Sequence, residues 1–307
     1  MYDNLNSSFE IPSDDNETEK RMAASPAFAN CTGEVDEDSH YCIKAFYRSM
    51  RIEYFPYKKS GRVRGSLHSF ALGHNRGSFT AEMVKNACAE LAQELGIPAD
   101  LLRVYKLEIG VNIHTPTSPE AFLHSLLHHK RKPFWPISPP RNATRPFQFE
   151  ATYREYRIKF YDKGAYDRSK GYLSQPYQPL MRFELVLSSR RRLLEIVKQQ
   201  DLTLADLARP ALLQLFSHYL SEQWRLVQRK TPMRFIGQTI QEAILLHAVH
   251  TPEVWTDTKP TTPPSTFTYY RRKCDGLWKH FRSQAKPHLF DTLFTESLHK
   301  LLPSAAG

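Results

Sequence analysis

The stretch LRVYKLEIGVNIH, residues 102–114, decides the fold class because its side chains alternate in chemical character. Apolar side chains occupy every second position: Leu107, Ile109, Val111 and Ile113. The positions between them hold polar or small residues: Lys106, Glu108, Gly110 and Asn112. Successive side chains of a strand point to opposite faces of a sheet, so this alternation predicts a strand with one buried face and one polar face.

Other segments extend this sheet in both directions along the chain. Strand-like segments are predicted at residues 41–55, 62–70, 147–153, 156–163 and 180–188. Thr80 is expected to cap a helix that ends at Gly96, and a short helix is expected at 118–129. From residue 190 onward, apolar residues recur mainly at helical spacing. The sequence therefore predicts an α+β fold, with a mainly antiparallel sheet and packed helices, followed by a helical C-terminal region.

Three segments differ in composition and predict the domain organisation. Residues 1–39 contain ten acidic and two basic side chains and few large apolar ones, which predicts an acidic disordered arm. Residues 40–200 are expected to form the α+β domain, and residues 201–307 the helical region. No apolar run approaches the length of a membrane span, and the four cysteines show no C-x-x-C spacing. We therefore expect a cytoplasmic protein with no membrane partner.

The charge distribution indicates the partner. The chain carries a formal net charge of +10, but residues 1–39 are net −8, so the remaining body is net +18. A body this basic attracts a polyanion, because binding to a phosphate backbone releases condensed counterions. This favours a nucleic acid as the partner, and the partner that we expect is DNA, both single- and double-stranded.

Segment 156–163, YRIKFYDK, places a tyrosine among cations. Arg157, Lys159, Tyr161 and Lys163 share one face of the predicted strand. Nearby positive charge lowers the pKa of a phenol and attracts phosphate, the two conditions that a nucleophilic tyrosine needs. Tyr161 is therefore a candidate nucleophile. Asp162 lies on the opposite face unless the strand ends or bulges there.

Two carboxylates occupy the polar faces of other strands. Glu108 alternates with the apolar residues of 102–114, and Glu184 shares a face with Arg182 in segment 180–188. If the strands are neighbours, the two carboxylates have the hard oxygen ligands that Mg²⁺ or Mn²⁺ prefers. Cross-strand salt bridges are the structural alternative for the same residues.

Residues 128–146, HHKRKPFWPISPPRNATRP, combine five prolines with five cations. This composition predicts an extended, exposed loop. Lys130, Arg131 and Lys132 are its candidate DNA contacts, and a solvated linker that touches nothing remains the alternative.

Five ordered segments carry a resemblance to a known family: GSLHSF (65–70), LEIGVNI (107–113), YRIKFYDKG (156–164), LMRFEL (180–185) and LTLADL (202–207). Together they resemble the replication initiators of filamentous phages and their plasmid and mobile-element relatives. They are similar in outline to the rolling-circle initiators of small staphylococcal plasmids, in which a K-I-Y-N/D-K strand precedes an R-x-E strand. The resemblance covers about residues 40–210. Ala71 departs from the aromatic or Asn-rich continuation expected after GSLHSF.

The resemblance implies a metal-dependent enzyme that nicks one DNA strand at an origin and leaves a 5′-phosphotyrosine. By position, it implies Tyr161 as the nucleophile and Lys163, Lys159 and Arg182 as a phosphate clamp. It implies Glu108 and Glu184 as ligands of Mg²⁺ or Mn²⁺, with Asp162 and His68 as lesser candidates. Host replication proteins are further possible partners. A non-catalytic, sequence-specific DNA-binding protein is the main alternative, and the convergence of Tyr161, Glu108 and Glu184 around one cleft would discriminate between the two. An RNA-binding accessory protein ranks last, since the sequence lacks an RNP-type aromatic strand.

Overall fold

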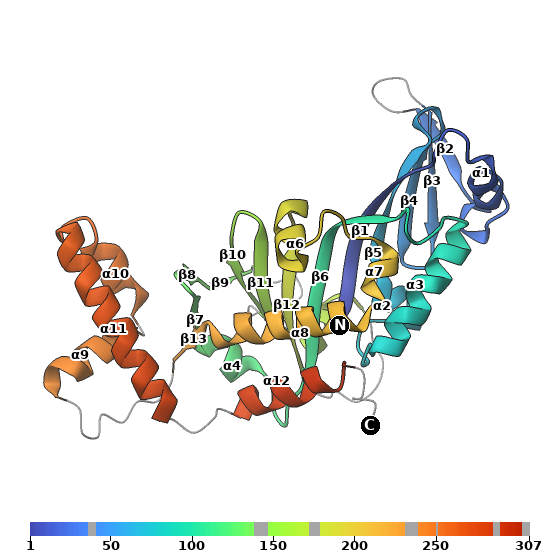
Figure 1. Cartoon of the computed structure of the whole chain (residues 1–307). Helices are drawn as coiled ribbons and strands as arrows, with labels where there is room; N and C mark the ends of the chain where they lie inside the picture. The colour runs from blue at the N-terminus through green and yellow to red at the C-terminus, as the bar shows by residue number, and fades with distance from the viewer. Residues whose placement is uncertain are drawn as a thin grey trace.

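A computed structural model describes residues 1–35, 41–137, 147–171, 179–230, 239–249, 251–284 and 289–302. Its centre is a ten-stranded antiparallel sheet (Figure 1) with the order β2-β3-β4-β5-β1-β6-β12-β11-β10-β9. The strands are β1 (Tyr2–Glu10), β2 (Thr32–Val35), β3 (Tyr41–Tyr47), β4 (Met50–Phe55), β5 (Ser60–Ser66), β6 (Arg103–His114), β9 (Trp135–Pro136), β10 (Gln148–Thr152), β11 (Tyr156–Asp162) and β12 (Leu180–Leu187). A smaller sheet has the order β13-β7-β8. Its strands are β7 (Leu126–His129), β8 (Lys132–Pro133) and β13 (Val227–Arg229).

Helices surround the sheets and become frequent toward the C-terminus, so the predicted α+β class is confirmed. They are α1 (Asn16–Ala23), α2 (Leu67–Leu72), α3 (Ala81–Leu95), α4 (Glu120–Ser125), α5 (Lys163–Ser169), α6 (Arg190–Val197), α7 (Leu204–Leu207), α8 (Pro210–Arg225), α9 (Ile240–Val249), α10 (Pro252–Thr258), α11 (Pro264–Gln284) and α12 (Leu289–His299). Two short 3₁₀ helices are η1 (Pro26–Phe28) and η2 (Pro56–Lys58).

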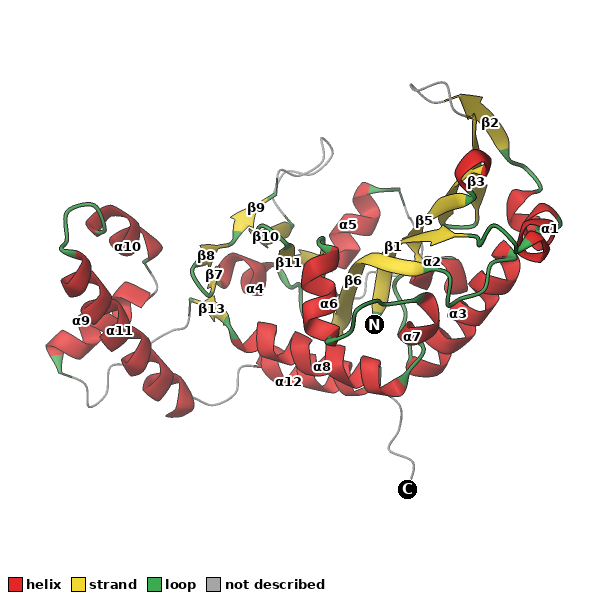
Figure 2. Ribbon diagram, turned by 45° about the horizontal axis from the view of Figure 1, so that its top comes forward, coloured by secondary structure: helices red, strands yellow, loops and turns green. Residues whose placement is uncertain are grey.

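The apolar face of the central strands is covered by helices. Phe183 of β12 contacts Trp224 of α8 and Phe294 of α12, with ring centroids 5.4 and 5.8 Å apart. Trp224 and Phe294 stack on one another at 4.3 Å. Figure 1 shows α8 and α12 crossing the near side of the sheet, and Figure 2 shows α5 on the other side of the central strands. The opposite face, which α5 approaches, carries the polar side chains of the central strands, among them Lys159, Tyr161, Arg182 and Glu184. We call it the polar face.

The N-terminal segment is part of the core, so the prediction of a disordered arm over 1–39 is wrong for residues 1–35. Strand β1 pairs with β5 on one side and with β6 on the other. Tyr2, Leu5 and Phe9 are at most 1% exposed. The sequence does not show an alternating pattern here because Ser7 interrupts the row of buried apolar side chains. In the structure, the pairing of β1 with β6 also shifts register twice. Residues 36–39 lie outside the described ranges.

Four other segments differ from the prediction. The segment 41–55 is not one strand but two, β3 and β4, which pair with one another. The segment 62–70 is not one strand, since Ser66 ends β5 and its hydroxyl caps α2 by accepting from the Ser69 amide. The segment 118–129 is a helix only as far as Ser125, because β7 follows. In the cationic loop, residues 128–137 include three short strands, with His129 fully buried, and 138–146 lie outside the described ranges.

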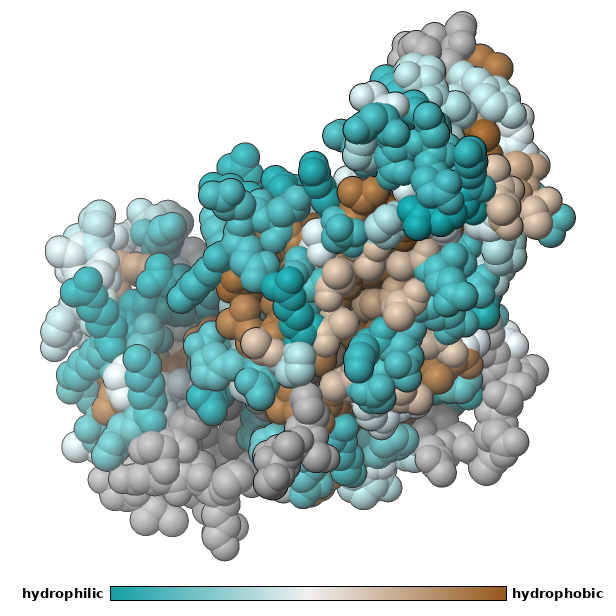
Figure 3. All heavy atoms as spheres, turned by 45° about the vertical axis from the view of Figure 1, so that its right-hand side comes forward, coloured by the Kyte–Doolittle hydropathy of each residue, from teal (hydrophilic) through white to brown (hydrophobic). Residues whose placement is uncertain are grey.

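The C-terminal region is not one separate helical unit. Helices α8 and α12 belong to the main core, and β13 lies between helical segments. Helices α9 to α11 pack on one another through a second cluster of buried side chains: Leu246, Val249, Cys274 and Trp278. Among the described residues, no helix is long and apolar enough to cross a membrane. Figure 3 shows that hydrophilic side chains cover most of the face turned to the viewer and that apolar ones emerge mainly in the hollows.

Candidate active site on the polar face of the sheet

Strands β6, β12 and β11 lie side by side and bring the predicted residues together. Lys159 pairs with Glu184, and Tyr161 pairs with Arg182, across β11 and β12. On the other side of β12, Gly110 pairs with Glu184. A side chain at Gly110 would have its Cβ 2.9 Å from Cγ of Glu184 and 2.6 Å from the Phe183 carbonyl oxygen. Gly110 therefore leaves the space that the Glu184 side chain occupies.

Tyr161 and Glu184 form a direct hydrogen bond. The Tyr161 hydroxyl donates to Oε1 of Glu184 at 3.1 Å, and both side chains are buried. Burial raises the pKa of Tyr161 well above its usual value, and the negative charge of Glu184 raises it further. The expectation that cations lower this pKa is therefore wrong for the arrangement seen here. The carboxylate beside the hydroxyl is instead placed to accept its proton.

Glu108 and Glu184 share one cation. Lys159 Nζ lies 3.3 Å from Oε2 of Glu184 and 3.8 Å from Oε2 of Glu108. Burial raises the pKa of Glu108, and the nearby charge of Glu184 adds to the shift. Burial opposes the charge of Lys159, but the two glutamates hold its pKa above its usual value. Asn4 also donates to Glu108 at 2.9 Å. The carboxylates thus lie close together with only one ammonium group between them.

Arg182 is held inside the protein. Its Nη2 lies 2.8 Å from Asp3 Oδ2, its Nη1 donates to Asn112 Oδ1 at 2.9 Å, and its Nε donates to Glu184. Only 2% of the residue is exposed. Burial opposes its charge, but Asp3 and Glu184 keep its pKa above its usual value. Arg182 is therefore not open to a DNA phosphate as the clamp prediction requires; it fixes the position of Glu184.

Lys163 and Asp162 leave the strand face because the chain enters α5 at this point. Asp162 caps the helix by accepting from the Ala165 amide at 2.8 Å. Lys163 Nζ bonds to Asp167 at 2.6 Å, and burial lowers the pKa of Lys163. The structure therefore does not place Lys163 in the row with Tyr161, nor Asp162 beside the glutamates.

His68 lines a cavity of about 330 Å³ together with Gly110, Asn112 and Arg182, and neither Glu108 nor Glu184 lines it. Its ring stacks on Phe79 with centroids 4.7 Å apart, and only 2% of the residue is exposed. Burial, with the charge of Arg182, lowers its pKa to about 2. Across the described ranges, no three or more His, Cys, Asp or Glu side chains gather as a metal site. The four predicted ligands are thus not brought together; only Glu108 and Glu184 are.

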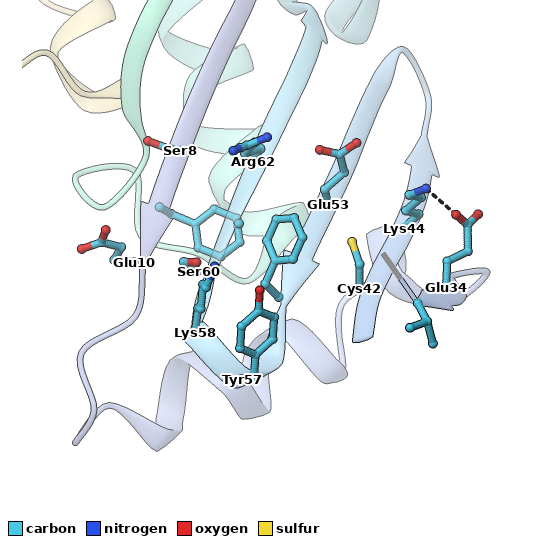
Figure 4. A pocket seen from close by; sticks show the side chains of 14 residues that line it. Ser8, Glu10, Glu34, Cys42, Lys44, Glu53, Tyr57, Lys58, Ser60 and Arg62 are labelled. Carbon is cyan, nitrogen blue, oxygen red and sulfur yellow. Dashed lines mark hydrogen bonds and ion pairs between the residues drawn. The ribbon is translucent and has the colours of Figure 1, made fainter. Parts of the chain in front are cut away.

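The polar face continues onto β3, β4 and β5, where it is hollowed. Figure 4 shows a cavity of about 520 Å³, the outer cavity, into which Glu53, Tyr57 and Arg62 project. Three aromatic rings on and beside this part of the face each have a cation nearby. The pairs are Arg51 with Phe46 at 5.9 Å, Arg62 with Phe55 at 6.0 Å and Lys58 with Tyr57 at 5.0 Å. Phe46 is 73% exposed, and Tyr57 is 46% exposed. Aromatic rings beside cations are the usual means of holding single-stranded nucleic acid.

The remaining predicted DNA contacts lie on the surface. Arg157 is partly exposed and lies 3.5 Å from Glu150. Lys130, Arg131 and Lys132 are exposed beside β7 and β8. These three cations do not line the outer cavity and do not contact the Tyr161–Glu184 pair in the described contacts.

Sequence reasoning missed Asp3, Asn4 and Asn112 as members of the site. Asp3 and Asn4 reach it because β1 lies next to β6. Asn112 donates to the carbonyl oxygens of Asn75, Arg76 and Gly77 and so ties the loop before α3 to the sheet. Asn112 could have been predicted from the sequence, since it shares the polar face of its strand with Glu108. Asp3 could not, because its segment lacks a recognisable strand pattern.

Comparison with protein-family models and with curated proteins gives no match to this sequence.

Proposed function

We propose that this protein binds DNA along the polar face of its sheet and nicks one strand through a phosphotyrosine intermediate at Tyr161. One observation carries the proposal: the Tyr161 hydroxyl donates to Glu184 while Glu108 and Lys159 lie beside that carboxylate. A nucleophile, a base within hydrogen-bond distance and a cation that suits a phosphate are the parts that transesterification needs.

The chemistry follows from these parts. The Tyr161 oxygen attacks the phosphorus and forms the new P–O bond, while its proton passes to Glu184. The bond between phosphorus and O3′ breaks, and O3′ takes up a proton from water. The raised pKa of Tyr161 suits this general-base route, because the phenol keeps its proton until the attack. The intermediate conserves the energy of the phosphodiester, so a 3′-hydroxyl can later attack it and rejoin the strand.

Glu108 and Glu184 would hold a divalent cation. Burial and the charge of Glu184 raise the pKa of Glu108 although Lys159 lies beside it, so a bound divalent cation would favour the charged form of Glu108. Mg²⁺ commonly binds through one or two carboxylates and takes its other ligands from water and substrate phosphate, so two glutamates suffice. When bound, the cation supplies Lewis-acid polarisation of a phosphoryl oxygen.

Access to Tyr161 sets a condition on this proposal. Its ring lies 5.4 Å from the ring of Tyr166, which belongs to α5. Helix α5 must therefore shift for a phosphate to reach the Tyr161 hydroxyl. Tyr166 is the second candidate nucleophile, because it is less buried and Lys163 and Lys170 have Nζ atoms 5.2 and 5.8 Å from its ring centroid.

The test is a nicking assay on supercoiled DNA with Mg²⁺, followed by a denaturing gel that detects a covalent protein–DNA adduct. We expect relaxed circles and an adduct on Tyr161. If the protein binds DNA but forms no nick and no adduct in the presence of Mg²⁺ or of Mn²⁺, it is a non-catalytic DNA-binding protein.

A further inference from the structure

A second cavity, distant in sequence from Tyr161, lies where the small sheet meets helices α10 and α11. It has a volume of about 710 Å³, within the range of small-molecule sites. His128, Arg131 and Pro133 line it from the side of β7 and β8, and the other lining residues come from 255–275. We call it the helical pocket.

The helical pocket is strongly cationic. Its lining includes four cations and one carboxylate, Asp275. The four cations are Arg131, Lys259, Arg271 and Arg272. Within the described part of the chain, none of these four forms an ion pair. A cleft lined mainly by one sign of charge concentrates ions of the opposite sign, so this lining favours an anionic ligand.

Two aromatic side chains share the pocket with these cations. The Trp255 and Phe267 rings meet edge to face with centroids 5.9 Å apart. Cζ of Arg271 lies 4.6 Å from the centroid of the Trp255 ring. Trp255 Nε1 donates to the Ala248 carbonyl oxygen at 2.8 Å, which holds the indole in place. A fixed aromatic surface beside arginines suits a planar base attached to a phosphate.

His128 lines the helical pocket on the side of β7. The residue is only 8% exposed, and its Nδ1 makes no hydrogen bond among the residues that the structure describes. Burial lowers its pKa, so the imidazole is neutral and Nδ1 can serve as donor or acceptor according to the tautomer. The neutral His128 side chain therefore adds no positive charge to the lining of the pocket.

We infer that the helical pocket binds one nucleotide. The base packs against Trp255 and Phe267, and the phosphate lies among the four cations. The same chemistry has two sources, a free nucleotide or one nucleotide unit of a DNA strand. This inference does not depend on Tyr161, because the pocket shares no residue with the Tyr161 site.

The experiment measures binding to the Tyr161→Phe protein, in which no covalent adduct can form at residue 161. The probes are dAMP, deoxyribose 5-phosphate, inorganic phosphate and a short single-stranded oligonucleotide, each followed by calorimetry. We expect dAMP or the oligonucleotide to bind at least about tenfold more tightly than deoxyribose 5-phosphate, because only they bring a base. If the oligonucleotide displaces dAMP, the pocket holds one nucleotide unit of a strand. If dAMP stays bound, the pocket holds a free nucleotide. Equal affinities for dAMP and inorganic phosphate, or no binding of any base-containing probe, would overturn the inference.

A matched pair of variants locates the binding. Lys259→Ser/Arg272→Ser removes two exposed cations of the pocket, and Lys85→Ser/Lys279→Ser removes two exposed lysines that do not line it. We expect the first variant to bind the preferred probe about tenfold or more weakly and the second to bind it unchanged. Arg272→Lys alone should retain most of the affinity. An equal loss in both double variants would mean that general charge, and not the pocket, attracts the probe. All four replaced residues are exposed, and circular dichroism verifies that the fold persists.

Discussion

Asp3 and Arg182 are 179 positions apart in the sequence, yet Oδ2 of one lies 2.8 Å from Nη2 of the other inside the protein. Asp3 also accepts hydrogen bonds from Ser66 and Asn75. Through Arg182, which donates to Glu184, the first strand of the chain fixes the carboxylate that faces Tyr161.

Asp3→Asn should lower the free energy of unfolding at pH 7 by about 3 kcal/mol, since it removes one partner of a buried ion pair. Burial alone would raise the pKa of Asp3, but Arg182 holds it below its usual value. The stabilisation is therefore present above the unfolded pKa of about 4 and is lost as the pH falls through the folded pKa. Urea denaturation from pH 7 to pH 3 measures this. Asp14→Asn, at an exposed carboxylate, is the control and should change nothing. A constant gap between wild type and Asp3→Asn down to pH 3 would contradict the assignment.

Tyr161→Phe should lower nicking by roughly 10³-fold or more and leave DNA binding nearly intact, because it removes one hydroxyl and keeps the ring. Tyr166→Phe is the matched control, since the two rings lie 5.4 Å apart. Adduct formation on a denaturing gel and binding by anisotropy are the two readouts. If only Tyr166→Phe loses the adduct, Tyr166 is the nucleophile and the proposed role of Tyr161 fails.

Glu108→Gln should raise the Mg²⁺ concentration needed for nicking and, at the same time, stabilise the fold at pH 7 by about 1 kcal/mol. Burial and Glu184 raise the pKa of Glu108, so the fold favours its protonated form. Its contribution to stability is complete below the unfolded pKa of about 4 and is lost as the pH rises through the folded pKa. Glutamine has no charge at any pH, so the variant does not lose this stability as the pH rises.

Glu184→Gln serves as the comparison, because Glu184 accepts hydrogen bonds from Tyr161, Lys159 and Arg182. Removal of its charge should therefore destabilise the fold. Urea denaturation at pH 7 and Mg²⁺ titration of nicking provide the measurements. Destabilisation by Glu108→Gln with unchanged Mg²⁺ dependence would make Glu108 a plain salt-bridge partner of Lys159.

Phe46→Ala and Tyr57→Ala should each weaken binding of single-stranded DNA about tenfold, because a stacked base contributes about 1–3 kcal/mol. Both rings are already largely or partly exposed, so the free energy of unfolding should change little. Anisotropy with a labelled oligonucleotide measures the effect. Tyr269→Ala, at another exposed tyrosine away from this face, is the control. Unchanged affinity in both variants would remove the outer cavity, which Tyr57 lines, and the face beside it, which carries Phe46, from the DNA path.

Arg131→Ser/Lys132→Ser should reduce the slope of log K against log salt on duplex DNA by roughly 2, since each phosphate contact contributes about 0.9. The change should be the same on specific and random sequences, because phosphate contacts carry no base information. Lys85→Ser/Lys279→Ser removes equal charge elsewhere and is the control. An unaltered slope would mean that residues 131 and 132 never reach the DNA.

The main strands and the residues of their polar faces could be predicted from the sequence. The alternation in 102–114 and 156–163 predicted β6 and β11. Tyr161, Glu108 and Glu184 lie close together as expected, but all three are buried, whereas the prediction placed them around a cleft. Period-two alternation is a local property that follows from the geometry of one strand, so it can be read without knowing the neighbours. The boundary errors arose where a local signal was weak, as at Ser66, where a helix begins directly after a strand.

The protonation of the site and the place of β1 were decided only by the tertiary structure. Positive charge near Tyr161 in the sequence predicted a lowered pKa, but burial and the Glu184 carboxylate reverse the direction. Residues 1–10 looked like part of an acidic arm, but they complete the sheet and supply Asp3 to Arg182. Solvent exposure and cross-strand neighbours depend on which distant strands pair, and no local pattern encodes that pairing. Within each strand, the sequence by itself determined which side chains share a face. The assembled sheet determined where the strands end, which side chains touch and which carry charge.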